Sequence, residues 1–330
     1  MAHELHDEHA NEAVDGTYGA KSEKRLLRSH LPKLAGTITI HTIDEIGRKT
    51  PLLVDLKPSG NNYMTDSHNS GGIVGLLLEL KHLLCLDAMT VTGETLGQEL
   101  ANAALPIIPR ERVIQPFSEP LCPASSLVVL RGNLALAMRV MKASASKYKH
   151  LLQHTGRAVV FANSSDMAER KDDPNLEVTK DSVLVLQNIG PVGNPGMRES
   201  VMITSPRKPG YRGVLSMLRL SDGRTSGTAG GTIVIHIVPE AADPSSILGI
   251  VQTGNTITFD VEKRLLRLNV SDEEISRRQE ERAKTLQEKD APWVTRDDMR
   301  GYRGLYMREV KQAQFGADFK FLTAEGPCAK

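Results

Sequence analysis

Two glycine-rich segments constrain this chain more than any other feature. The first, Gly190–Glu199, reads GPVGNPGMRE, and the second, Ser221–Thr228, reads SDGRTSGT. Glycines at this density let the backbone adopt positive φ angles and approach a ligand closely. The segments carry a carboxylate, Glu199, and a hydroxyl, Ser226, which are the groups that magnesium binding and proton abstraction need. They therefore predict a ligand site built from two loops.

Composition narrows the class of protein. The chain has 330 residues, enough for two domains, with 40% hydrophobic residues and a net charge of +1. The balanced charge argues against a nucleic-acid binder, and no apolar run is long enough to cross a membrane. Residues 1–7 lack the apolar core of a secretory signal. Three widely separated cysteines fit a reducing compartment, so we expect a cytoplasmic protein.

Changes of pattern along the chain divide it into three parts. Residues 1–36 are polar and are expected to lack fixed structure. Residues 37–118 indicate an α/β segment, and residues 119–330 a β-rich domain with flanking helices. The predicted fold class is therefore α+β, with the β-rich part forming a barrel or sandwich and not a parallel nucleotide-binding sheet.

Within the α/β segment, leucines at helical spacing predict a helix over 71–86. A strand is expected over 89–92, followed by a helix capped by Thr92 or Thr95. The proline-rich stretch 106–123 has the character of an interdomain linker.

In the β-rich part, short apolar runs are separated by turns, and a capping sequence at 271–274 opens a charged helix running to about residue 288. The predicted strands are 127–134, 157–161, 183–189, 214–220, 232–238, 256–261 and 265–270.

Four further motifs accompany the glycine-rich segments in order: Asp55–Gly60 (DLKPSG), Met64–Gly72, Thr90–Gly97 and Leu130–Ala135. Several ordered motifs are far stronger evidence than any one alone. Together they resemble the C-terminal part of the dihydroxy-acid and sugar-acid dehydratase family. The segment Leu152–Phe161 is most similar to the arabinonate and xylonate dehydratase branch.

The resemblance implies a large N-terminal α/β domain, holding an iron–sulfur cluster and Mg²⁺, and a β-rich swivelling domain, with the active site between them. It assigns Glu199 to a magnesium-ligand position and Ser226 to the base that removes the proton next to a carboxylate. Thr228, Arg224 and Gly227 would contact the substrate. Family members act on small hydroxy acids.

Plainer roles for these residues stay open at this stage. Glu199 is also suited to capping a following helix, and Ser226 to a simple turn. Arg224 has a neighbouring carboxylate, Asp222, with which it would form a local ion pair if it does not bind a substrate carboxylate.

The chain departs from the family pattern in its cysteines. The resemblance implies three cluster-binding cysteines before the DLKPSG turn, but none of the 54 residues before Asp55 is cysteine. Cys85 is expected to be buried on an apolar helix, Cys122 lies in the predicted linker, and Cys328 is near the end. No Cys-x-x-Cys spacing exists, so these three are not expected to bind a cluster.

We therefore expect a shortened dehydratase-like hydro-lyase that removes water from a sugar acid or a specialised-metabolism acid, with Mg²⁺ as the candidate cofactor. The alternatives are a catalytically inactive binding or regulatory homologue and a half-enzyme that needs a cluster-bearing partner chain. A homodimer, or a partner protein covering the shortened α/β segment, is also expected.

Overall fold

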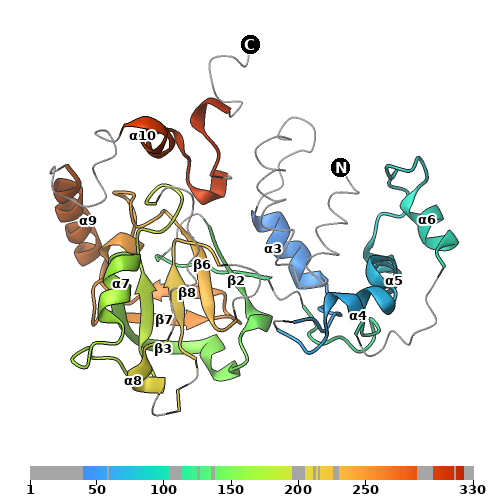
Figure 1. Cartoon of the computed structure of the whole chain (residues 1–330), viewed down its shortest axis with the longest axis horizontal. Helices are drawn as coiled ribbons and strands as arrows, with labels where there is room; N and C mark the ends of the chain where they lie inside the picture. The colour runs from blue at the N-terminus through green and yellow to red at the C-terminus, as the bar shows by residue number, and fades with distance from the viewer. Residues whose placement is uncertain are drawn as a thin grey trace. The chain divides into compact units, whose positions relative to one another are not determined.

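The computed structural model divides the chain into two compact units, with the division inside strand β1 (Leu127–Val129), between Val128 and Val129 (Figure 1). It describes residues 40–57, 59–104, 113–124, 127–134, 138–194, 205–210, 213–214, 216–225, 230–287, 300–315 and 317–322.

The described part of the first unit contains short helices joined by turns and by isolated β-bridges. Its helices are α3 (Ile40–Lys49), α4 (Met64–Asn69), α5 (Gly72–Glu79), the 3₁₀ turn η1 (Lys81–Leu83) and α6 (Leu96–Asn102). Thr95 begins α6 as the sequence predicts. Its Oγ1 accepts the Gln98 N–H at 3.3 Å, and the Gln98 side chain accepts the Thr95 N–H at 2.8 Å. Two backbone donors at the start of the helix are thereby satisfied.

Two expectations for this unit are wrong. The helix predicted over 71–86 breaks at Leu80 into α5 and η1. The strand predicted over 89–92 is a turn, because the hydroxyls of Thr90 and Thr92 both donate to Glu99 Oε1, at 2.6 and 2.5 Å. These side-chain bonds favour a turn over an extended strand.

The predicted linker is part of the first unit's core. Val113 and Ile114 are buried among the leucines of α5. Ile114 bridges Val54, and Cys122 bridges Leu52, both antiparallel. The described part of 106–123 therefore packs as an edge of this unit, and the prolines mark turns within it.

The second unit is built on one mixed eight-stranded sheet, with the order β1-β2-β6-β5-β4-β3-β7-β8. Strands β3, β4, β5 and β6 run parallel to one another. On one side β2 pairs antiparallel with β6; on the other, β7 pairs antiparallel with β3, and β8 antiparallel with β7. The strands are β1 (Leu127–Val129), β2 (Met138–Lys142), β3 (Gln153–Phe161), β4 (Val183–Leu186), β5 (Arg219–Ser221), β6 (Ile233–Val238), β7 (Thr256–Asp260) and β8 (Leu265–Leu268).

This curled sheet confirms the predicted α+β class, although its parallel centre was not predicted. The motif after β1 brings the sheet round on itself: Arg131 bridges Leu265 of β8, and Asn133 exchanges two hydrogen bonds with Leu268. Gly132 lies so close that a Cβ there would be 2.1 Å from the Leu266 carbonyl oxygen. Residues 130–134, predicted as strand, therefore form this closing turn.

Strand β2 was missed by the sequence analysis because MRVMK is short and the neighbouring apolar pair Val140 and Met141 breaks the alternation expected of a strand. The strand predicted over 214–220 is shorter and later: Arg219–Ser221 pairs with β4, and Arg219 and Leu220 also pair with β6.

Helix α7 contributes Met167 to a buried cluster with Phe161 and Leu184 on one face of the sheet. The second unit's α-helices are α7 (Ser164–Arg170), α8 (Arg207–Gly210), α9 (Asp272–Gln287) and α10 (Gly301–Glu309). Its 3₁₀ turns are η3 (Ala143–Ala145), η4 (Lys149–Leu152), η6 (Leu248–Ile250), η7 (Ala313–Phe315) and η8 (Lys320–Leu322).

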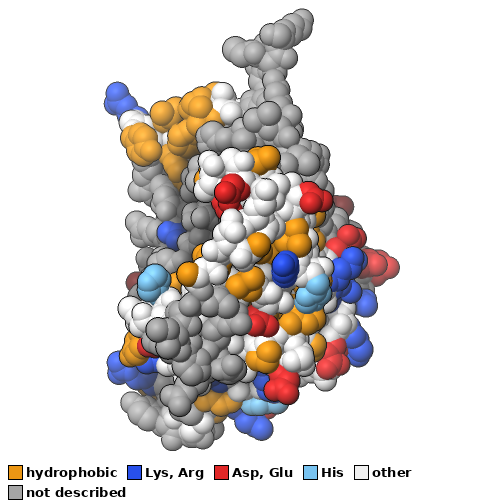
Figure 2. Space-filling view, turned by 90° about the vertical axis from the view of Figure 1, so that its right-hand side faces the viewer, with side chains coloured by type: hydrophobic (Ala, Val, Ile, Leu, Met, Phe, Trp, Pro, Cys, Tyr) orange, Lys and Arg blue, Asp and Glu red, His pale blue; other side chains and the backbone are white. Residues whose placement is uncertain are grey.

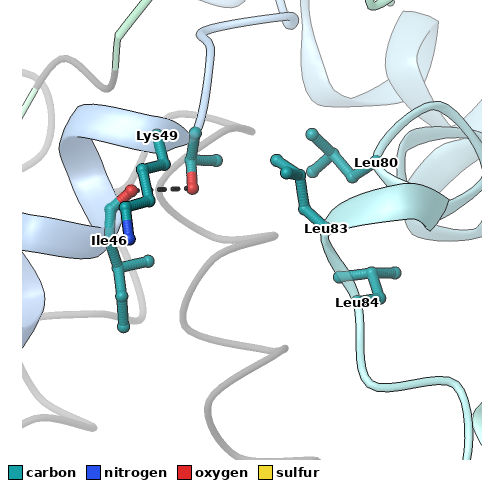
Figure 3. A pocket seen from close by; sticks show the side chains of 6 residues that line it. Ile46, Lys49, Leu80, Leu83 and Leu84 are labelled. Carbon is teal, nitrogen blue, oxygen red and sulfur yellow. Dashed lines mark hydrogen bonds between the residues drawn. The ribbon is translucent and has the colours of Figure 1, made fainter.

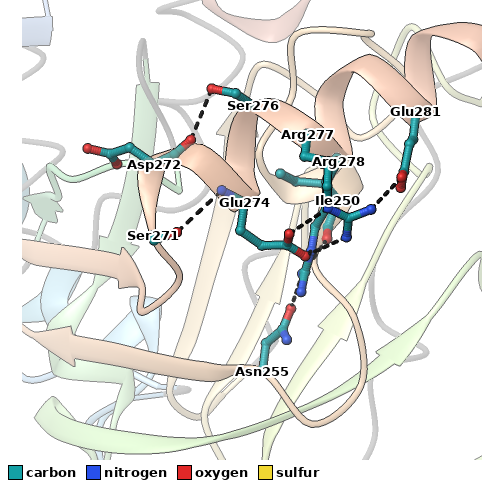
Figure 4. A network of polar contacts seen from close by, with 9 residues as sticks. All are labelled: Ile250, Asn255, Ser271, Asp272, Glu274, Ser276, Arg277, Arg278 and Glu281. Carbon is teal, nitrogen blue, oxygen red and sulfur yellow. Dashed lines mark hydrogen bonds and ion pairs between the residues drawn. The ribbon is translucent and has the colours of Figure 1, made fainter.

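Helix α9 matches the predicted charged helix and is joined to the sheet by arginines. Ser271 Oγ accepts the Glu274 N–H at 3.3 Å and caps its first turn. Arg278 donates from Nε to Glu274 Oε1 and from Nη1 to Asn255 Oδ1, both at 2.7 Å (Figure 4). Among the described residues, no helix has the length and apolarity needed to cross a membrane.

Candidate functional site

The sheet brings the two glycine-rich segments to one edge. Leu186 at the end of β4 and Ser221 at the end of β5 are paired residues on neighbouring parallel strands. The chain therefore leaves both strands at the same level and in the same direction. In open α/β sheets this edge, outside the carboxyl ends of parallel strands, is where ligands bind.

Asp222 links the two segments directly. Its side chain is fully buried and accepts the backbone N–H groups of Asn188 and Ile189, both at 3.0 Å. It also accepts the Ala241 N–H at 2.9 Å, from the turn after β6. One carboxylate thus joins the turns that follow three neighbouring strands. These three backbone donors use both oxygens of the Asp222 carboxylate.

Burial raises the pKa of Asp222, and the three backbone N–H donors oppose that rise. Burial lowers the pKa of Arg282 of α9, and the charge of Asp222 opposes that fall. Arg282 donates to the carbonyl oxygens of Gly249, at 2.7 Å, and Ala241. Helix α9 therefore stabilises the turn that donates to Asp222.

A second buried carboxylate shapes the first glycine-rich segment. Glu240 Oε2 accepts the N–H groups of Val192 and Gly193, at 2.9 and 3.1 Å. Gly190 passes so close that a Cβ there would be 2.4 Å from the Glu240 carboxyl carbon. Only glycine fits at this position, which explains part of the segment's composition. The Glu240 N–H in turn donates to Gln312 Oε1 at 3.0 Å.

The predicted site residues are placed only in part. Arg224 is half-buried and follows Gly223, whose carbonyl accepts the His236 N–H of β6 at 3.0 Å. Glu199, Ser226, Gly227 and Thr228 lie outside the described residues. Among the described residues, Asn188 and Ile189, just before the first segment, donate to Asp222 of the second.

The sequence analysis did not predict that Asp222, Glu240 and Arg282 hold the turns after strands β4, β5 and β6 in place. The available signal was weak. Each is a charged residue that follows or faces an apolar strand. The backbone groups bound by the two carboxylates, Asp222 and Glu240, lie between 19 and 48 residues away along the chain. Such distant partners leave no local pattern.

The described cysteines do not fit an iron–sulfur cluster. Cys85, predicted to be buried, is exposed, because the helix ends before it, and Cys122 is exposed as well. No cluster of three His, Cys, Asp or Glu side chains suited to a metal ion occurs within the described part of the chain. We therefore derive no step through a cluster. Asp222 and Glu240 bind backbone N–H groups, so neither matches the role of a magnesium ligand.

A small pocket of about 150 Å³ lies in the first unit and is separate from these residues (Figure 3). Leu80, Leu83 and Leu84 line one wall, and Ile46, Lys49 and Thr50 of α3 and its end line the other. The Thr50 hydroxyl is satisfied by the Ile46 carbonyl at 3.0 Å. This lining is mainly apolar and offers one cation, Lys49, and no carboxylate.

Comparison with known proteins identifies the family. The model of the dihydroxy-acid/6-phosphogluconate dehydratase C-terminal domain matches residues 112–317, and the N-terminal model of the same family matches residues 28–99. The chain belongs to this family. The C-terminal match contains the whole described sheet and both glycine-rich segments.

Individual relatives agree. The chain is 39% identical to an L-arabinonate dehydratase of Rhizobium leguminosarum bv. trifolii (strain WSM2304) over 89% of its own length and 49% of the relative's. It is 36% identical to a 6-deoxy-6-sulfo-D-gluconate dehydratase of Pseudomonas putida over 87% and 48%. A dihydroxy-acid dehydratase of Chloroflexus aurantiacus (strain ATCC 29366 / DSM 635 / J-10-fl) is 37% identical over 85% and 47%. The chain thus spans about half the length of these relatives.

Proposed function

We propose that this dehydratase-family chain acts as a hydro-lyase that removes water from a hydroxy acid of the sugar-acid type. One observation carries the proposal: Asp222 joins the starts of both glycine-rich segments at the carboxyl ends of parallel strands. That arrangement supports a shared site for Glu199 and Ser226. The similarity to arabinonate and sulfogluconate dehydratases favours sugar acids as substrates.

In the proposed reaction, Ser226 Oγ accepts the proton from the carbon next to the substrate carboxylate. The hydroxyl on the following carbon leaves and takes up a proton to form water, Ser226 returns its proton to solvent, and the resulting enol rearranges to a 2-keto acid. Arg224, Gly227 and Thr228 would bind and orient the acid. Glu199 would hold Mg²⁺, which when bound stabilises negative charge on the substrate. A serine becomes a base only where its pKa is lowered, which cationic surroundings achieve.

The test is water loss measured by mass spectrometry on the full chain. A panel of sugar acids and dihydroxy acids is incubated with Mg²⁺ and either the unaltered protein or Ser226→Ala. We expect turnover of at least one sugar acid, reduced about 100-fold or more in Ser226→Ala. The Ser245→Ala variant is the control, because Ser245 lies in a turn and bonds Asp243 locally. Equal rates for all three proteins would exclude Ser226 as the base.

We also propose that two copies associate, or that a partner binds, through apolar side chains of the first unit. Met64, Met89 and Val91 are 65%, 63% and 95% exposed. In the space-filling view, hydrophobic side chains lie among acidic and basic ones on the face shown (Figure 2). Light scattering of the purified chain tests association, and a monodisperse monomer would argue against the homodimer.

A further inference from the structure

The segment that follows α10 folds back on itself. The Lys311 N–H donates to the Asp318 carbonyl at 2.8 Å, and the Ala317 N–H donates to the Gln312 carbonyl at 3.3 Å. These bonds draw residues 310–315 and 317–319 together into one structure, the C-terminal strap. The Gln312 side chain remains available for contacts outside the strap.

The Gln312 carboxamide uses both of its ends on the turn after β6. Its Oε1 accepts the Glu240 N–H at 3.0 Å, and its Nε2 donates to Asp243 Oδ2 at 2.7 Å. A backbone N–H only donates and an ionised carboxylate only accepts, so these two partners fix the orientation of the amide. Gln312 therefore joins the strap to the 239–243 turn by two hydrogen bonds that fit a single arrangement.

Glu240 carries this contact on to the first glycine-rich segment. Its Oε2 accepts the N–H groups of Val192 and Gly193, at 2.9 and 3.1 Å, and Gly190 lies directly against its carboxylate. Glu240 is 0% exposed, so water does not readily replace a partner that it loses. One buried residue thus holds the strap through its N–H and the glycine-rich turn through its carboxylate.

We propose that the strap and the first glycine-rich turn, residues 190–193, are coupled through Gln312 and Glu240, so that loosening either one loosens the other. Gln312 is then a positioning residue for this turn and acts through Glu240. The inference does not depend on the reaction proposed for the chain. Because a coupling free energy is reciprocal, anything that orders the turn also orders the strap.

Gln279 provides a matched control. It lies on α9, and its Nε2 donates to the Ser245 carbonyl at 2.7 Å. This bond reaches the same connection after β6 from a different helix, at a residue beyond the 239–243 turn. Gln279→Met therefore removes a glutamine bond to this connection and leaves the contact between Gln312 and Glu240 in place.

The experiment measures amide hydrogen exchange in the full chain, with circular dichroism to show that each variant is folded. Gln312→Met keeps the length of the side chain and removes both of its hydrogen bonds. We expect exchange at Val192 and Gly193 to rise about fivefold, the size expected when one buried hydrogen bond is lost. In Gln279→Met, exchange at these two amides should change by less than about twofold.

The reverse perturbation is Gly190→Ala, whose added Cβ must displace the Glu240 carboxylate. In this variant we expect exchange at Lys311 and Ala317 of the strap to rise about threefold or more. Gln312→Asn and Glu240→Gln disturb the same bonds with less change of shape. They carry the comparison if either first variant does not fold.

Three outcomes would overturn the proposal. The first is faster exchange in the strap of Gln312→Met with unchanged exchange at Val192 and Gly193, which would show that Gln312 anchors the strap alone. The second is an equal rise at these two amides in Gln279→Met, which would show general loosening of the connection. The third is unchanged exchange of the strap amides in folded Gly190→Ala, which would exclude reciprocal coupling.

Discussion

The two units satisfy their carboxylates in different ways. In the first unit, Asp55 accepts hydrogen bonds from Asn61 and Asn62, six and seven residues further along. In the second unit, Asp222 accepts backbone N–H groups 19 to 34 residues away, and Glu240 accepts groups 47 and 48 residues away. Local bonds shape a single turn, whereas distant bonds assemble turns from separate strands. The second arrangement brings the turns after β4, β5 and β6 together.

The largest expected effect comes from removing the distant carboxylate. Asp222→Ala leaves three buried N–H groups without an acceptor, and we expect it to lower the free energy of unfolding by about 4 kcal/mol. Asp55→Ala, the matched change in the first unit, should cost about 1 kcal/mol, since its donors reach water. Urea denaturation of both variants measures the difference. Equal costs would remove the distinction between local and distant bonds.

Next in size is a test of whether the first unit has a core of its own. Leu80 is 1% exposed and packs with α5 and Ile114, so Leu80→Ala should cost about 3 kcal/mol. Val91, 95% exposed, serves as the control, and Val91→Ala should change stability by less than about 0.5 kcal/mol. Denaturation monitored by hydrogen exchange assigns each loss to its unit. A negligible cost for Leu80→Ala would contradict the packing described for this unit.

A smaller, pH-dependent effect belongs to the second unit. Burial lowers the pKa of Lys142 in β2 to about 8, from 10.5. The unfolded chain then binds more protons than the folded one between these values, so the Lys142 contribution to stability rises with pH in that window and is lost as pH falls toward 8.

Lys142→Met removes this titration. The free energy of unfolding of the unaltered protein, minus that of the variant, should increase by about 2 kcal/mol from pH 8 to pH 10. A pH-independent difference would show that Lys142 titrates normally. Lys149→Met, at an exposed position, controls for general loss of charge.

The contrast between local and distant contacts also explains which parts of the fold could be predicted from the sequence. The Thr95 cap, helix α9 and most β-strands depend on neighbours within a few residues, and patterns in the chain disclose them. The β4–β5 register, the closing contact at Gly132 and the support from Arg282 join residues far apart in the chain. The glycines of both segments were recognised, but the reason for Gly190 appears only when Glu240 is in place.

Two errors have the same origin. The stretch 106–123 was predicted to be a linker from its prolines, although its pairing with Leu52 and Val54 belongs to the first unit's core. Cys85 was predicted to be buried because a helix was expected to continue through it, whereas α5 ends at Glu79. Local composition is a poor guide where the end of an element depends on tertiary packing.

The most direct test of the central claim follows the proton that Ser226 is proposed to accept. A sugar acid deuterated at the carbon next to its carboxylate is supplied to the full chain in ordinary water, and the 2-keto product and solvent are examined by mass spectrometry and NMR. The account predicts loss of the label with each water eliminated, slower turnover than for the unlabelled acid, and neither process in Ser226→Ala. Elimination that retains the deuterium, or label loss that persists in Ser226→Ala, would contradict it.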